Sequence, residues 1–215
     1  MDEILLIDKP AGMSSFGVVA RVRRQLSQQV GHKVKVGHTG TLDPFATGLL
    51  ILLVGKATKR SGEFLKLDKW YEATIRLGYV STTGDVEGEI SEVSDKGVSA
   101  DEIEIVLKKF TGEILQKVPR YSAVKINGRR AYDLARKGIE VEMPRRKVTI
   151  YALELVSYKW PELKIKCNVS SGTYIRALGE DIGEELGVGG YLTELRRTRI
   201  GDYKIEDATS LAGEG

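Results

Sequence analysis

The sequence from Gly37 to Gly55, GHTGTLDPFATGLLILLVG, places a polar loop directly before a long apolar run. The apolar run is long enough to cross a protein core but too short to cross a bilayer. The loop is therefore anchored to a buried element, which is where binding and catalytic groups commonly lie. Because Asp43 precedes Pro44, its backbone is directed away from helical angles, and we predict that its side chain projects from a loop.

An Asp-Pro pair is also typical of an ordinary turn, so a purely structural role for Asp43 is the alternative. The neighbouring His38, Thr39 and Thr41 supply more polar groups than a turn requires. Together with the buried run that follows, they favour a functional loop.

The chain has 215 residues, of which 41% are hydrophobic. This length is sufficient for one large domain or for two modest lobes that share a core. The start, MDEILLIDKP, lacks the basic region and the cleavage site of a signal peptide, and no segment is apolar for long enough to span a membrane. We therefore expect a folded protein that resides in the cytoplasm and has no membrane partner.

The net charge is only +3, but the basic residues gather in clusters while the acidic residues concentrate elsewhere. A single cluster of this kind is usually a solvated surface. Several clusters in one chain suggest a basic face that binds phosphates. The clusters are Arg21, Arg23 and Arg24; Lys56, Lys59 and Arg60; Arg129 and Arg130; Arg145, Arg146 and Lys147; and Arg196, Arg197 and Arg199.

Apolar periodicity predicts a strand over Ile4–Ile7, and Ser14 or Ser15 can cap the helix that follows. A further helix is predicted over residues 57–67, followed by a strand in KWYEATIRLGYVSTTGD. The first helix is expected to bury the side formed by Phe16, Val19, Val22 and Leu26.

The middle of the chain contains two local signals for turns and helices. Ser99 and Glu102 form a capping box that opens a helix, and Asn127-Gly128 predicts a turn before another helix. The helix that follows the capping box is expected to have an apolar stripe formed by Ile103, Val106, Leu107 and Phe110.

After Lys147 the pattern predicts two strands, VTIYALELVSYKW and ELKIKCNVS. Cys167, the only cysteine, falls on the buried face of the second strand and excludes an internal disulfide. The segment SSGTYIRALGEDIGEEL predicts a strand-to-helix junction, and GGYLTELRRTRIGDY a helix or turn followed by a strand. Candidate caps of the junction helix are Ser170, Ser171 and Thr173.

Arg176 lies in the first turn of that predicted helix. The positive end of the helix dipole disfavours a cation at this position. An anionic partner would remove the penalty.

The motif GHTGTLDPFATGLL resembles the catalytic motif of RNA pseudouridine synthases, specifically of the bacterial TruB family, which acts on the T loop of tRNA. The resemblance extends over nearly the whole chain, from DKPAGMSS to LRRTRIG. It implies an α+β pseudouridine synthase fold, with a mixed, mainly antiparallel sheet, flanking helices and a central active-site cleft. It also implies that residues 1–215 are a single catalytic domain without the C-terminal PUA-type RNA-binding domain of bacterial members.

The resemblance assigns roles to individual residues. Asp43 corresponds to the essential catalytic aspartate, His38 to a histidine beside the target nucleotide, and Arg176 to an arginine that pairs with the aspartate. DKPAGMSS corresponds to a motif that supports the catalytic loop from behind, and Lys9 belongs to it. By contrast, His32 is predicted to be a surface loop residue.

The resemblance also implies a pocket for the target base, formed by Tyr71, Tyr174 and Leu195. In the motif KWYEA the tyrosine stacks against the base, which needs such a surface when it leaves the RNA stack. Tyr71 also alternates with Ala73 and Ile75 on one strand face, so a core role is its alternative. Assistance of Tyr71 in proton removal is a further hypothesis.

The implied reaction converts uridine-55 of the tRNA T stem-loop into pseudouridine. It breaks a glycosidic bond to nitrogen and forms one to carbon, so neither a redox cofactor nor a nucleoside triphosphate is required. The sequence has no phosphate-binding loop or dinucleotide fingerprint, and two histidines and one cysteine make a metal cluster implausible. We expect no cofactor, no metal, and a monomeric enzyme that binds tRNA.

Two other classes of protein remain as alternatives. A non-catalytic module that binds structured RNA would keep the basic clusters and the tyrosines but would not need an ionised aspartate. A metal-assisted RNA hydrolase would use His38 and Asp43 as metal ligands.

Overall fold

A computed structural model describes residues 2–211 of the chain. They divide into two compact units, each of which is described by itself. The first unit comprises residues 2–72 and 194–211, and the second comprises residues 73–193. The strands β4 (Lys69–Leu77) and β12 (Gly190–Ile200) are neighbours, and each contributes residues to both units.

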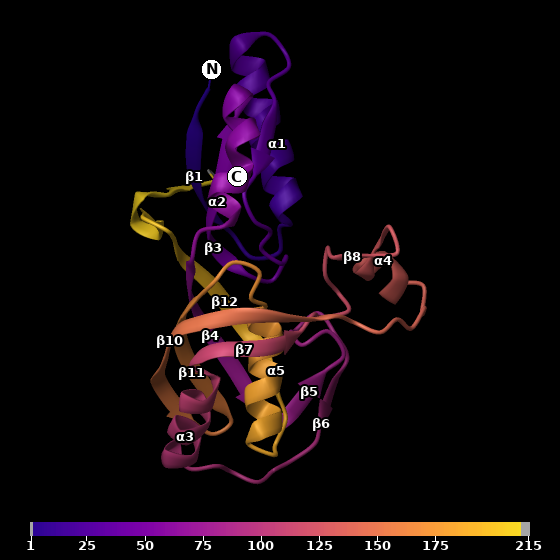
Figure 1. The fold of residues 1–215 in the computed structure, drawn as a ribbon. Helices are drawn as coiled ribbons and strands as arrows, with labels where there is room; N and C mark the ends of the chain where they lie inside the picture. The colour runs from indigo at the N-terminus through magenta and orange to yellow at the C-terminus, as the bar shows by residue number, and fades with distance from the viewer. Residues whose placement is uncertain (1, 212–215) are drawn as a thin grey trace. The chain divides into compact units, whose positions relative to one another are not determined.

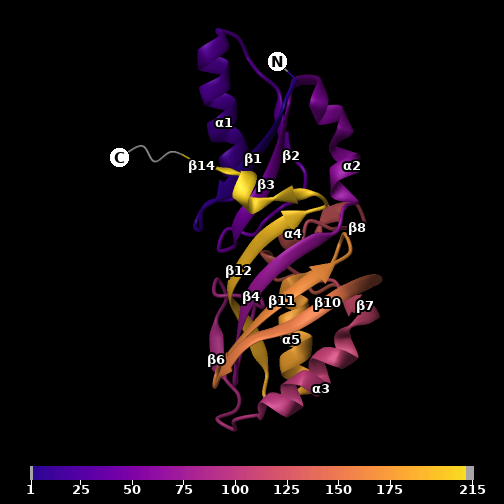
Figure 2. The same cartoon turned by 90° about the vertical axis from the view of Figure 1, so that its left-hand side faces the viewer.

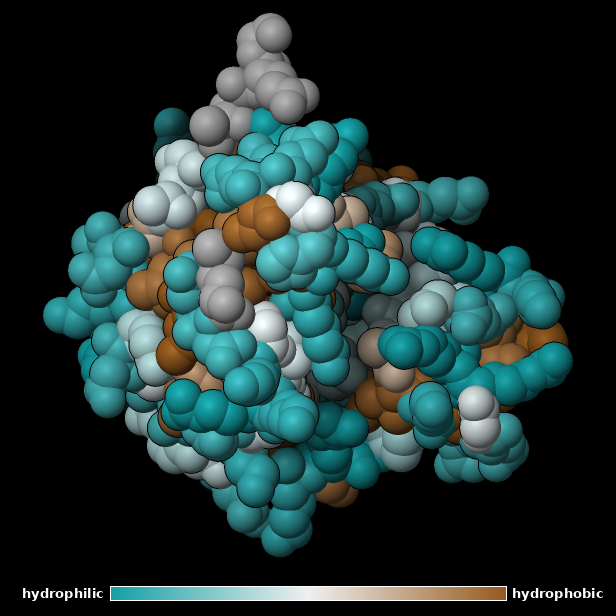
Figure 3. All heavy atoms as spheres, turned by 90° about the horizontal axis from the view of Figure 1, so that it is seen from above, coloured by the Kyte–Doolittle hydropathy of each residue, from teal (hydrophilic) through white to brown (hydrophobic). Residues whose placement is uncertain are grey.

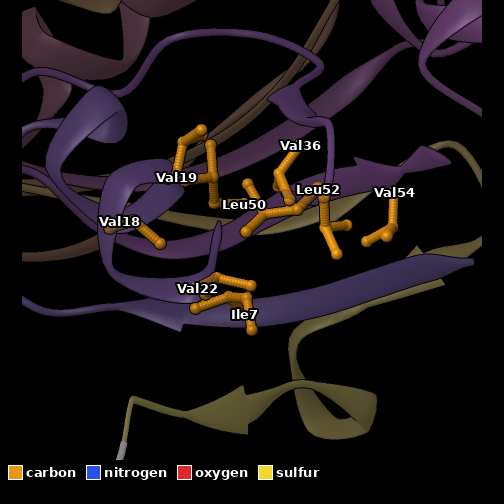
Figure 4. Packing of buried hydrophobic residues seen from close by; sticks show 9 residues of the cluster. Ile7, Val18, Val19, Val22, Val36, Leu50, Leu52 and Val54 are labelled. Atoms are coloured by element: carbon orange, nitrogen blue, oxygen red, sulfur yellow. The ribbon is translucent and has the colours of Figure 1, made fainter. Parts of the chain in front are cut away.

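The first unit is organised around β3, whose side chains are buried on both faces. One face packs against α1, β1 and β2 through Leu50, Leu52 and Val54 (Figure 4). The other face packs around Phe64 of α2. In Figure 2, α1 and α2 lie on opposite sides of these strands. The elements are β1 (Ile4–Lys9), α1 (Ser15–Val30), β2 (Val36–His38), β3 (Thr47–Val54), η1 (Gly55–Arg60), α2 (Ser61–Leu65), β13 (Tyr203–Lys204), η2 (Ile205–Asp207) and β14 (Thr209–Ser210).

A strand that is buried on both faces needs apolar side chains at consecutive positions, which explains the unbroken run LLILLV. β3 pairs antiparallel with β1 and β2 and parallel with β12. β1 in turn pairs parallel with β14 at its other edge.

In the second unit the strands β4, β11, β10 and β7 are neighbours in that order. β10 is antiparallel to both β11 and β7, and the helices α3 and α5 pack beside these strands (Figure 1). The segment with β8, β9 and α4 extends away from the sheet (Figure 1). The elements are β5 (Tyr79–Ser81), β6 (Ile90–Glu92), α3 (Ala100–Phe110), β7 (Gly112–Lys117), β8 (Lys125–Ile126), β9 (Arg129–Arg130), α4 (Ala131–Ala135), β10 (Arg145–Lys159), β11 (Glu162–Val169) and α5 (Ile175–Glu185).

The prediction of an α+β fold with a mixed, mainly antiparallel sheet and flanking helices is confirmed. The capping box of Ser99 and Glu102 opens α3, and Asn127-Gly128 forms the β8–β9 turn with positive φ at both residues. Cys167 is fully buried in β11.

Two local predictions are wrong. The predicted burial of Phe16 is wrong: it is 65% exposed, and Ser15 and Val18 are buried beside the expected Val19 and Val22, with Leu26 partly buried against the same cluster. Of the helix or turn predicted before the strand of the final block, the helix is wrong, whereas the predicted strand is present as β12.

The surface is mostly polar, as Figure 3 shows for one face, where hydrophobic side chains occur in scattered positions. No helix in residues 2–211 is long and apolar enough to span a membrane.

A glycine is required where β3 meets β12. A Cβ atom on Gly48 would lie 2.3 Å from the backbone oxygen of Arg197, and its φ is +101°. We predict that Gly48→Ala lowers the free energy of unfolding by about 3 kcal/mol or more, because backbone strain and steric overlap add. Urea unfolding measures this loss.

Gly31→Ala is the matched control, because Gly31 also has a positive φ, of +74°, but has open space where the methyl group would go. We expect it to cost about 1 kcal/mol. Equal losses in the two variants would contradict the role given to the close strand contact.

Candidate active site

Asp43 lies in the loop between β2 and β3 and is half-buried. Its carbonyl oxygen accepts a hydrogen bond from the Ala46 nitrogen at 3.1 Å, which closes a turn across Pro44. The prediction that Asp43 lies in a loop anchored to a buried element is therefore confirmed.

The turn between β1 and α1 supports this loop. The Lys9 ammonium group is fully buried and donates to the carbonyl oxygens of Pro44 at 3.1 Å, Met13 at 2.6 Å and Pro10 at 2.8 Å. The Gly12 nitrogen also donates to the Pro44 oxygen, at 2.9 Å. A buried ammonium group is tolerated only with such partners. The predicted support of the loop by DKPAGMSS is confirmed.

A second clamp holds the residue on the other side of Asp43. The buried Ser15 hydroxyl donates to the Leu42 oxygen at 2.9 Å and accepts from the Leu42 nitrogen at 2.8 Å. The backbone on both sides of Asp43 is thus fixed, at Leu42 and at Pro44. This arrangement restricts the direction in which the carboxylate can point.

Arginines of β12 hold the remainder of the loop. Arg197 is 1% exposed, and its guanidinium donates to the oxygens of Leu49 at 2.8 Å and Gly40 at 3.2 Å. Arg196 makes a two-pronged ion pair with Asp8, at 3.1 and 2.8 Å. The assignment of Arg197 to a phosphate-binding face is therefore wrong, because a buried guanidinium engaged by backbone carbonyls cannot meet an RNA phosphate.

His38 ends β2 and is half-buried. Burial, and secondarily the positive charge of Arg197, lower the pKa of the imidazole, so the ring is neutral at neutral pH. The buried Nδ1 atom has no hydrogen-bond partner among residues 2–211. A neutral imidazole can lie beside an uncharged base without needing a charged partner. His32 is an exposed loop residue, as predicted.

Tyr71 and Leu195 are each 7% exposed and lie on the neighbouring strands β4 and β12. Beside Tyr71 in the sequence, the buried Lys69 donates to the oxygens of Leu65 and Leu67, at 3.2 and 2.5 Å. Burial, with a smaller effect of Arg197, lowers the pKa of Lys69 to about 8. The burial of Tyr71 is compatible with a base pocket and with its alternative core role.

In the second unit, Arg176 lies in the first turn of α5, as predicted. Its Nε atom is 3.4 Å from a carboxylate oxygen of Asp85, and its other nitrogens donate to the oxygens of Thr83 at 2.8 Å and Tyr121 at 2.9 Å. Asp85 is 2% exposed, so this is a buried pair. The carboxylate supplies an anionic partner that a cation at a helix N-terminus requires. Burial raises the pKa of the nearby Glu180 to about 7, against the opposing effect of Arg176.

Tyr174 is the N-cap residue of α5 and has no side-chain cap, so the prediction of a serine or threonine cap is wrong. Its backbone is held instead by the buried Gln116 amide, which donates to the Tyr174 oxygen at 3.0 Å and accepts from the Tyr174 nitrogen at 2.8 Å. The Arg146 guanidinium lies 5.9 Å from the centre of the tyrosine ring. Gln116 therefore positions the start of the helix that carries Arg176.

Sequence reasoning did not identify Asp85, Gln116, Arg197 or Ser15 as site residues. The sequence gives a weak indication of a site residue at Asp85, since it is the only acid in the polar turn STTGD. It gives no such indication at Gln116, which occupies an ordinary position in a short strand. Within residues 2–211, no three His, Cys, Asp or Glu side chains are grouped so that they could hold a metal ion.

Comparisons with known proteins define the class. Residues 23–175 match the family described as TruB family pseudouridylate synthase (N terminal domain), and residues 176–212 match tRNA pseudouridylate synthase B C-terminal domain. Similar curated proteins are named tRNA pseudouridine synthase B. The one from Aquifex aeolicus is 47% identical over 98% of this chain and 72% of its own length. The one from Aromatoleum aromaticum is 48% identical over 98% of this chain and 67% of its own length.

Solved structures agree with this class. One, titled as a crystal structure of a Cbf5-Nop10-Gar1 complex, matches 97% of this chain with a TM-score of 0.74 and 32% identity. Another, titled as an H/ACA RNP bound to a substrate RNA containing 2'-deoxyuridine, has a TM-score of 0.70 and 30% identity. The chain spans about half the length of these two proteins, 52% and 50%.

The fold is that of a pseudouridine synthase, an isomerase. The chain belongs to the TruB family of pseudouridylate synthases.

The hydrogen bonds between Ser15 and the Leu42 backbone predict that a change at Ser15 lowers turnover, although Ser15 is not the catalytic residue. Ser15→Ala removes both hydrogen bonds to Leu42 and is expected to lower turnover about tenfold or more, because small displacements of reacting groups are costly. Steady-state kinetics on an RNA substrate measures it.

The adjacent Ser14 provides the control. Its side chain caps α1 by accepting from the Gly17 nitrogen, at 3.0 Å, so Ser14→Ala is expected to cost about 1 kcal/mol of stability. Turnover at saturating substrate is expected to stay within about twofold. Similar turnover in both variants would show that the Leu42 clamp does not position Asp43.

Lys69 predicts a pH dependence of stability. Its pKa is about 8 in the folded protein and 10.5 when unperturbed, so the unfolded chain binds more protons between these values. The free energy of unfolding of the wild type should therefore rise, relative to that of Lys69→Met, as the pH rises from about 8 to about 10. Urea unfolding of both proteins across this range tests the sign, and a constant difference would contradict the lowered pKa.

Proposed function

We propose that this chain converts uridine-55 in the T loop of tRNA into pseudouridine, with Asp43 as the catalytic nucleophile acting on a flipped-out uridine. The observation that carries the proposal is the double clamp on the backbone of Asp43, at Leu42 through Ser15 and at Pro44 through Lys9. The names of the curated relatives support tRNA as the substrate.

The chemistry explains why a fixed carboxylate is needed. The reaction breaks the bond between the uracil nitrogen and the ribose, turns the uracil and joins its carbon to the ribose. The carbon releases its proton and the freed nitrogen takes up one, so the composition of the nucleoside is unchanged and no electrons leave. An ionised carboxylate can attack the ribose or the ring, and both routes require it to approach from one fixed direction. The clamps on Leu42 and Pro44 provide that direction before the RNA binds.

Arg176 is proposed to pair with Asp43 and to keep the carboxylate ionised. A guanidinium has five N–H donors. The contacts with Asp85, Thr83 and Tyr121 orient it, and the pairing with Asp43 uses further donors of the same group. The buried Asp85 thus acts as a positioning residue for the catalytic arginine.

The remaining proposed residues hold the detached base. Tyr71 stacks against the uracil and is the candidate to assist proton removal, while Leu195 and Tyr174 complete the pocket. His38 contacts the nucleotide, and its neutral state suits a position beside an uncharged base. The base must leave its stack at a cost of a few kcal/mol, which these contacts offset in part.

We further propose that residues 1–215 form a single catalytic domain that needs no cofactor, and that the enzyme is monomeric and cytoplasmic. Light scattering on the purified protein, alone and with tRNA, tests the oligomeric state.

Replacement of the carboxylate tests the central role. Asp43→Asn keeps the shape of the side chain and removes its charge, so turnover should fall at least about a thousandfold while the affinity for a T-arm RNA stays within about tenfold. Mass spectrometry of the RNA after derivatisation of pseudouridine measures turnover, and filter binding measures affinity.

Asp68→Asn is the control, since Asp68 is an exposed loop acid of the same unit. It should retain full turnover. Residual turnover in Asp43→Asn near the wild-type rate would exclude the nucleophile role. Absence of turnover in the wild type, with RNA binding intact, would favour the non-catalytic RNA-binding module.

A further inference from the structure

The solvent-facing side of α1 and of the loop after it has an unusual charge distribution. Between Asp8 and Asp43 the sequence contains no acidic residue. In the same stretch it carries the cations Lys9, Arg21, Arg23, Arg24, Lys33 and Lys35. A surface helix normally mixes both signs, because ion pairs one turn apart stabilise it.

Three of the other basic clusters differ from this one in their partners. Arg60 pairs with Glu63, Lys147 with Glu113, and Arg199 with Asp202. Arg196 is paired with Asp8 as described above. By contrast, Arg23, Arg24 and Lys33 make no ion pair within the described residues 2–211. Their mutual repulsion is relieved when an anionic partner binds.

The same side of α1 is hollowed. The small side chains of Gly17, Ala20 and Ser27 line the hollow, together with the cations Arg24 and Lys33. The spacing of three and seven residues places Gly17, Ala20 and Ser27 on one side of the helix. A concave surface with cations along it suits an extended anionic chain.

Phe16 connects this surface with the active site. It follows Ser15, which is bonded to Leu42 beside Asp43, and its ring is 65% exposed. An exposed aromatic ring next to cations is the arrangement with which proteins hold unstacked bases and their phosphates. From Phe16 to Ser27 the helix is about 16 Å long, enough to contact several nucleotides.

We propose that the outer face of α1, from Phe16 to Lys33, binds the sugar-phosphate backbone of the substrate RNA next to the target uridine, with the Phe16 ring against an unstacked base. This surface is separate from the base pocket and rests on the proposed function, which supplies the RNA. The arginines contribute affinity, and Phe16 fixes the position of the loop relative to Asp43.

Removal of the arginine charges tests the electrostatic part. The variant Arg23→Gln/Arg24→Gln keeps helix propensity and is expected to weaken binding of a T-arm RNA about tenfold at 0.15 M salt. The slope of log Kd against log salt concentration should fall by about 1.5, the value for two lost phosphate contacts. KM should rise with Kd, while kcat at saturating RNA stays within about twofold.

Lys108→Gln/Lys109→Gln is the control for net charge, because it removes two adjacent cations from the last turn of α3, of which Lys109 is paired with Glu185. It should change the salt slope by less than about 0.5. Equal effects of the two double variants would overturn the proposal, because they would reflect net charge alone.

Substitutions of the exposed Phe16 test the stacking part. Phe16→Tyr keeps the ring and should bind RNA like the wild type, whereas Phe16→Leu and Phe16→Ala should weaken binding about fivefold or more. If Phe16→Leu binds as well as Phe16→Tyr, the ring does not stack.

The two proposals fail in different ways. If the wild type does not modify T-arm RNA, the proposed function fails. If the wild type modifies it and the arginine variant binds like the lysine control, only the proposed role of α1 fails.

Discussion

A buried ammonium group connects the elements on which the active site depends. Lys9 ends β1, and its three hydrogen bonds bring the carbonyl oxygens of Pro10, Met13 and Pro44 around one charge. An ion in this position is stable only while all of these acceptors are present, so the turn before α1 and the aspartate loop hold each other in place. Ser15 extends the same arrangement to Leu42. The result is a carboxylate whose backbone is set by the fold.

The double burial of β3 gives this arrangement a rigid base. Its two faces enter different hydrophobic clusters, so neither the register nor the position of the strand can change without exposing apolar side chains. Gly48 permits the close approach of β12, and that approach places Arg197 where its guanidinium reaches Leu49 and Gly40. The close packing of the core therefore fixes the position of the loop before β3.

The sequence predicted those parts of the fold that follow from local pattern. The apolar run of β3, the capping box of α3 and the Asn127-Gly128 turn each carry a signal within a few residues. On α1 only Phe16 was assigned wrongly, because Ser15, a polar residue, takes the buried position beside it through its bonds to Leu42. Periodicity cannot reveal a hydrogen bond across 27 residues.

The site was predictable only where a continuous motif carried it. Asp43, His38 and Arg176 were assigned through motifs, whereas Asp85 and Gln116 act through contacts with residues far away in the chain. Arg197 looked like part of a basic surface, because sequence alone does not separate a buried guanidinium from an exposed one.

Hydrogen exchange in the RNA-free protein tests most directly whether the loop is fixed before substrate binds. The amide of Leu42 donates to Ser15 and that of Gly12 donates to Pro44. Both should exchange at least about a hundredfold more slowly than the same residues in an unstructured peptide. Exchange of both amides at the unstructured rate would show that the loop is not held in the free enzyme and would contradict the account.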